Sequence, residues 1–138
     1  MLQYSSILFA ILSLFAFQYD LLLDTVLLGT LAFLSFINHS KLIRLPIMFH
    51  VLDKLYAHIF AVTYAVLTVW YALTTKSMMF VLSLALGLLA SAIYYLNWLP
   101  HICVHILVFV AGVAYLLGRA GLESRSSLQN KSKDKTIL

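Results

Sequence analysis

Between Leu55 and Gly118 the chain carries a single charged residue, Lys76. Soluble domains are far more polar, with roughly 25% of their residues charged. Over all 138 residues, hydrophobic residues make up 63% and charged residues 10%, and the mean hydropathy is +0.99. A soluble fold of this length has too little interior to bury so much apolar surface, whereas a bilayer solvates it when backbone polar groups are bonded within helices. The sequence therefore predicts an all-α, multi-pass integral membrane protein and leaves open which membrane it occupies.

Turn residues and prolines divide this apolar sequence into five predicted membrane-spanning helices, measured against the roughly 20 residues that one crossing needs. The expected ranges are residues 2–18, 22–38, 46–74, 78–96 and 100–118. Pro46 and Pro100 are placed in the first turns of the third and fifth helices, where a missing N–H costs nothing. Asp20 and Asp24 are interpreted as loop-end charges between the first two helices. Residues 1–118 are thus predicted to form one polytopic helical bundle.

Residues 119–138 differ in composition and are predicted to form a basic, flexible C-terminal tail. The segment is rich in Ser, Gln and Asn, and its five basic residues outnumber its two acidic ones. Such a segment cannot bury enough apolar area to fold alone.

Two pairs of polar residues, each spaced four apart, interrupt the apolar helices. Ser35 and His39 end the second predicted helix, and His101 and His105 open the fifth. Residues four apart lie on the same face of a helix, so each pair presents two side chains to one point. Ionisable or metal-binding groups at membrane depth are costly, and their default interpretation is a functional site.

Helix direction brings both pairs together with Asp53, near the start of the third helix. Because each crossing reverses the chain, the end of the second helix and the starts of the third and fifth lie on one side of the membrane. Ser-x3-His, Asp and His-x3-His have the composition of the ligands and supporting groups of a zinc ion. Zinc held by three imidazoles would activate a water molecule, Asp53 would accept its proton, and Ser35 would orient the water or steady the oxyanion.

The pattern resembles the alkaline ceramidase and progestin/adipoQ receptor superfamily of membrane zinc hydrolases. Its signature is Ser-x3-His at the end of the second helix, Asp at the start of the third and His-x3-His on the last helix. The matching residues here are Ser35, His39, Asp53, His101 and His105. The resemblance implies that the three histidines bind zinc, and that Asp53 and Ser35 hold the water that attacks a lipid amide or ester.

The resemblance covers roughly residues 30–110, and the chain departs from the superfamily in helix number. Members of the superfamily have seven helices, whereas five are predicted here. Both numbers are odd, so the last helix still begins on the side of the predicted site. The two missing helices would otherwise help to line the lipid cavity, so this chain would be a short, five-helix version.

The predicted function is therefore a zinc-dependent hydrolase of ceramide or another acyl lipid, which enters from the bilayer. No nucleic-acid partner is expected. Two alternatives belong to other classes: a non-catalytic receptor or membrane-remodelling protein with a structural zinc site, and a small helical membrane protein without metal. The sequence leaves the oligomeric state open. It also leaves the orientation open, because Lys41, Arg44 and Lys54 lie on the site side and Lys76 and the tail on the other.

The remaining histidines and the single cysteine receive simpler interpretations. His50 and His58 are interpreted as packed, hydrogen-bonded residues. His50 lies three residues before Asp53, so it is also the alternative to His39 as third zinc ligand. Cys103 is interpreted as a small apolar residue.

Overall fold

The computed structural model describes residues 3–39, 47–96 and 100–136. These ranges contain five helices: α1 (Gln3–Gln18), α2 (Leu22–His39), α3 (Ile47–Thr75), α4 (Met78–Leu96) and α5 (His101–Thr136). The all-α, five-helix prediction is confirmed, and four of the helices end within one residue of the predicted positions. The fifth does not end at Gly118: the helix continues to Thr136.

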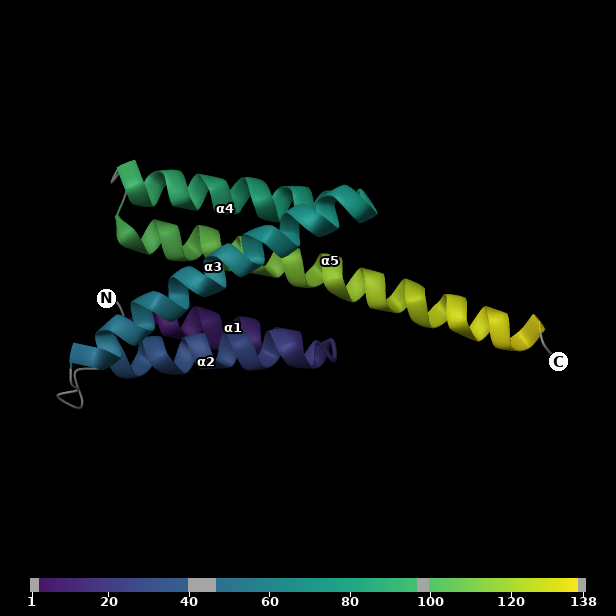
Figure 1. Ribbon diagram of the computed structural model, residues 1–138, viewed down its shortest axis with the longest axis horizontal. Helices are drawn as coiled ribbons and strands as arrows, with labels where there is room; N and C mark the ends of the chain where they lie inside the picture. The colour runs from purple at the N-terminus through teal and green to yellow at the C-terminus, as the bar shows by residue number, and fades with distance from the viewer. Residues whose placement is uncertain (1–2, 40–46, 97–99, 137–138) are drawn as a thin grey trace.

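Two antiparallel hairpins and one crossing helix make up the bundle (Figure 1). The first hairpin is α1 with α2, the second is α4 with α5, and α3 runs diagonally across both. The end of α2 and the starts of α3 and α5 lie at the same end of the bundle, as helix direction predicts. We call this the site end. The α1–α2 and α3–α4 turns lie at the opposite end, which we call the far end.

The far-end turns are tight because each places one residue in the left-handed backbone region. Asp20 has φ 58° and Lys76 has φ 53°. After α1, the Asp20 N–H donates to the Phe17 carbonyl at 3.1 Å, and the Leu21 N–H donates to the Ala16 carbonyl at 3.0 Å. This is a Schellman motif, which satisfies the last carbonyls of a helix and reverses the chain.

The core lies where α5 packs against α1 and α4. Its largest fully buried side chains are Tyr115, Phe80, Leu12 and Leu116. Glycines permit these close approaches: a Cβ on Gly112 would lie 2.8 Å from Leu12 Cδ1, and one on Gly118 would lie 2.8 Å from Phe80 Cζ. A side chain at either position would therefore force the Leu12 or Phe80 side chain to move.

Within the described ranges, three helical segments are long and apolar enough to cross a membrane. They are Ile47–Thr75, Met78–Leu96 and Ile102–Ser126. The apolar stretches of the first hairpin, Ser6–Gln18 and Leu22–Asn38, are shorter. Many large hydrophobic side chains, including Leu73 and Trp70, point outward. These features are consistent with association of the bundle with a membrane.

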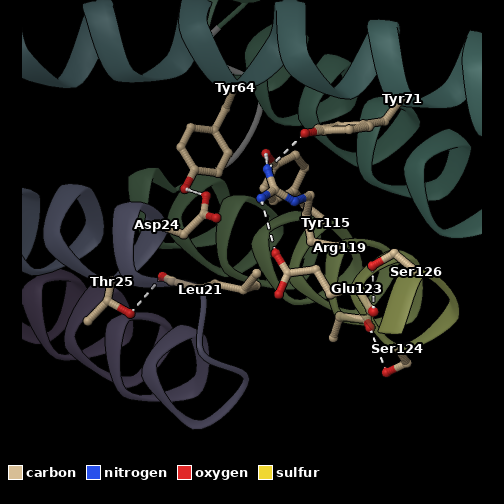
Figure 2. Close-up of polar contacts among 11 residues, drawn as sticks. Leu21, Asp24, Thr25, Tyr64, Tyr71, Tyr115, Arg119, Glu123, Ser124 and Ser126 are labelled. Atoms are coloured by element: carbon tan, nitrogen blue, oxygen red, sulfur yellow. Dashed lines mark hydrogen bonds and ion pairs between the residues drawn. The ribbon is translucent and has the colours of Figure 1, made fainter. Parts of the chain in front are cut away.

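Arg119, which the sequence analysis assigns to the tail, contacts the bundle (Figure 2). Its Nη1 donates to the Tyr71 hydroxyl at 2.9 Å and lies 3.4 Å from the Tyr115 hydroxyl. The guanidinium also lies 5.1 Å from the centre of the Tyr71 ring. Because α5 continues without a break past Gly118, Arg119 falls one helical turn beyond buried Tyr115 and on the same face. The chain beyond Arg119 is helical to Thr136, and the flexibility of this tail stays a prediction.

Asp24 is buried, with 4% of its surface exposed, so its interpretation as a loop-end charge is wrong. Its Oδ1 accepts a hydrogen bond of 2.5 Å from the Tyr64 hydroxyl on α3 (Figure 2). The reason is helical position: Asp24 begins the inward face of α2 that continues through buried Leu28, Leu31 and Ser35. Asp20, by contrast, is exposed in the turn.

Candidate functional site

A cavity of about 510 Å³ lies between α3 and the other four helices. Its volume falls within the roughly 300–1,000 Å³ that is typical of small-molecule sites. Polar side chains gather in its wall toward the site end of the bundle: Ser35, Asn38, His50, Asp53 and His105. The structure therefore brings three of the five predicted site residues, from α2, α3 and α5, to one cavity.

Asp53 lies in the second turn of α3 and is buried, with 8% of its surface exposed. It begins the inward stripe of that helix, which continues through Ala57, Phe60 and Tyr64. Its Oδ2 accepts a hydrogen bond of 2.6 Å from the side-chain amide of Asn38 on α2. This bond fixes the carboxylate and links the ends of two helices.

Asn38 is a site residue that the motif spacing did not predict. Besides its bond to Asp53, its amide group contacts His50: Asn38 Nδ2 lies 3.0 Å from His50 Nδ1 and Oδ1 lies 3.1 Å from the same nitrogen. His50 and Asp53 are thus joined through one amide. The available signal was spacing, because Asn38 follows Ser35 by three residues and so shares its helix face.

Ser35 is buried between α1 and α2, with 7% of its surface exposed. Its Oγ accepts a long hydrogen bond of 3.4 Å from the Ser6 hydroxyl. Acting as the acceptor in this contact leaves the Ser35 O–H able to donate to another group, such as the oxygen of a ligand in the cavity.

His105 is half-buried in the cavity wall, where its ring meets the edge of Phe9 with centroids 6.4 Å apart and planes at 85°. His39 is the last residue of α2 and His101 the first of α5, so both backbones lie at the site end. The side chains of His39 and His101 lie outside the described part of the structure.

The predicted zinc set depends on those two undescribed side chains. Among the side chains that are described, no three His, Cys, Asp or Glu residues are grouped to hold a metal ion. The donors suit zinc in kind, because imidazole nitrogens are among its usual ligands, and His101 precedes His105 by one helical turn. The zinc site, including His50 as the alternative ligand, stays a prediction.

His58 is exposed and Cys103 is half-buried. His58 Nδ1 donates to the Lys54 carbonyl at 2.7 Å, so this ring is hydrogen-bonded as predicted, but it is exposed at the rim of the cavity.

The polar groups deeper in the cavity wall are bonded within the bundle. Thr68 Oγ1 donates to the Tyr64 carbonyl at 2.6 Å, and Ser83 Oγ donates to the Ala111 carbonyl at 2.8 Å. The Tyr64 hydroxyl is held by Asp24. An occupant of the cavity would therefore meet a largely apolar wall beyond the polar site end.

The cavity opens sideways between α3 and α4. These helices meet at the far end and diverge toward the site end (Figure 1). Wall residues on both sides of the gap are exposed on the surface, among them Ala61 and Ala65 of α3 and Leu88 and Tyr95 of α4. The cavity thus meets the surface along the side of the bundle as well as near the site end, where His50, Lys54 and His58 are exposed.

Comparisons of this chain with protein-family models, with curated proteins and with solved structures find no match.

Proposed function

We propose that this protein is a membrane-embedded, zinc-dependent hydrolase that cleaves an acyl amide or ester bond of a lipid. The observation that carries the proposal is the convergence of Ser35, Asp53 and His105, from three helices, on one apolar cavity that opens sideways. A hydrolase needs a group that takes a proton and a group that stabilises a developing negative charge, close to the bond that breaks. An apolar cavity open to the side suits a substrate delivered from a bilayer.

The proposed membrane arrangement has all five helices crossing. The three long helices supply ordinary crossings. With 16 and 18 residues, α1 and α2 are about 24 Å and about 27 Å long, slightly less than the roughly 30 Å of a hydrocarbon core. A shortfall of this size is accommodated by local thinning of the bilayer at modest cost.

The residues assigned to hold zinc are His39, His101 and His105, with His50 as the alternative to His39. Zinc bound there would polarise the scissile carbonyl and make water more acidic.

Asp53 is assigned the role of general base. Asn38 holds its Oδ2, which leaves Oδ1 to accept a proton from water. Ser35 would donate its O–H to the carbonyl oxygen as negative charge develops there. The apolar wall beyond these residues would hold the acyl chain and exclude bulk water.

The alternative function is a receptor or membrane-remodelling protein in which zinc only clasps the helices. The contacts that favour it are the bonds from Asn38 to Asp53 and from Ser6 to Ser35, because both join neighbouring helices without any substrate. Under this alternative the cavity binds a lipid and leaves it unchanged.

Two measurements on purified full-length protein test the proposal. Metal analysis is expected to find one zinc per chain, retained in His58→Ala and lost in His105→Ala. Turnover of a long-chain acyl amide such as ceramide is expected to disappear with a chelator and to return with zinc. Protein that folds with zinc but cleaves no acyl lipid would support the clasp alternative, and protein without zinc would contradict both.

A further inference from the structure

Lys54 places a positive charge at the rim of the cavity. It follows Asp53 directly on α3, lines the cavity and is exposed. The one ion pair among the described side chains is Arg119 with Glu123, so no described carboxylate lies within salt-bridge distance of Lys54. The nearest carboxylate in sequence, Asp53, is held by Asn38. The ammonium is therefore available to an anion on a ligand.

The size and length of the cavity fit one acyl chain. Its volume of about 510 Å³ lies within the roughly 300–1,000 Å³ of small-molecule sites, which is enough for one acyl chain. Along α3, the cavity wall extends from His50 to Thr68, eighteen residues or about 27 Å. One leaflet of a hydrocarbon core is about 15 Å thick, so a chain of membrane-lipid length fits lengthwise.

We infer that the cavity selects an acyl lipid with a negative charge on its polar part, held by Lys54, with one acyl chain lying along α3. This inference rests on the proposed function for the bond that is cleaved, and it adds the class of lipid. The charge would lie one residue away from the proposed base, so the scissile amide or ester would join the chain to a short anionic group. N-acyl amino acids have this form. An ammonium beside an apolar wall binds an anion more strongly than one in bulk water.

The test compares two probes that share a chain and an amide, N-palmitoylglycine and N-palmitoylethanolamine. They differ in a carboxylate against a neutral hydroxymethyl group. Binding is measured by displacement of a fluorescent fatty acid from full-length protein in nanodiscs of zwitterionic lipid, with empty nanodiscs as blank. The expected result is about tenfold tighter binding of N-palmitoylglycine, the size of one charge-assisted hydrogen bond.

Two lysine variants test whether Lys54 causes the tighter binding of N-palmitoylglycine. Lys54→Met keeps most of the aliphatic stem and is expected to bind both probes equally, whereas Lys76→Met at the far end keeps the tenfold difference. N-acetylglycine, which has the anion but almost no chain, is expected not to compete at the same concentrations. Equal binding of both probes by the native protein, or a preference retained in Lys54→Met, would overturn the inference, as would competition by N-acetylglycine. Binding requires no turnover, so the hydrolase proposal can fail while this inference holds, and the reverse.

Discussion

The side-chain amide of Asn38 donates a hydrogen bond of 2.6 Å to the buried carboxylate of Asp53, and this bond joins the end of α2 to the start of α3. Asn38→Leu keeps the approximate size of the side chain and removes the donor. A buried carboxylate that loses its partner costs about 1–3 kcal/mol, so we expect the free energy of unfolding to fall by that amount.

The same change is expected to slow lipid hydrolysis, because Asp53 would no longer be held in one position. Thr30→Val is the matched control on α2, since Thr30 is exposed and its hydroxyl donates to the Val26 carbonyl of its own helix. Denaturation in detergent and turnover assays check both effects. An Asn38→Leu protein as stable and active as the control would show that the bond has no role in either.

At the far end, the Tyr64 hydroxyl donates a hydrogen bond to the carboxylate of buried Asp24. Tyr64→Phe removes this donor and keeps the ring that stacks on Phe60 with centroids 4.2 Å apart. We expect a loss of about 1–3 kcal/mol in the free energy of unfolding. The exposed Tyr95→Phe is the control and should leave stability unchanged.

A double-mutant cycle with Asp24→Asn separates the bond itself from other effects of removing the hydroxyl. If the two residues are coupled, Tyr64→Phe should cost less in the Asp24→Asn background than in the native protein. Equal costs in both backgrounds would mean that the contact contributes no stability.

Membrane topology can be tested at the turns. If α1 and α2 both cross, Tyr19 and Met78 lie on the same side of the membrane and Ile47 lies on the other, because the two turns share the far end of the bundle. Single cysteines at these exposed positions, in a Cys103→Ala background, are labelled with a membrane-impermeant maleimide in sealed vesicles. Labelling of Tyr19→Cys from the same side as Ile47→Cys would show that the first hairpin turns back within the membrane.

Helix positions could be predicted closely because apolar length and turn residues determine them. Asp20, Lys76 and the two prolines mark the chain reversals, and long continuous apolar segments satisfy their backbone polar groups within helices. The end of α5 could not be predicted. A change from apolar to polar side chains after Gly118 shows where burial decreases, not where a helix stops.

The candidate site could be predicted in part. Ser35, Asp53 and His105, which the four-residue spacing and helix direction singled out, all line the cavity, and their roles stay predictions. Asn38 was missed because an amide next to His39 at a helix end also has an ordinary interpretation as a polar terminus. Asp24 was misread for a related reason: sequence distance from a turn does not show whether a carboxylate faces solvent or a tyrosine on another helix.

The most direct test of the central claim is the turnover of a long-chain acyl amide by zinc-loaded native protein and by the Asp53→Asn variant. The Asn side chain still has an oxygen that can accept from Asn38, so we expect unchanged zinc content and unfolding temperature, but it cannot take a proton from water. The predicted result is a loss of hydrolysis by a factor of about 10²–10⁴. Unchanged turnover in Asp53→Asn, at equal zinc content, would contradict the assignment of Asp53 as the base at this site.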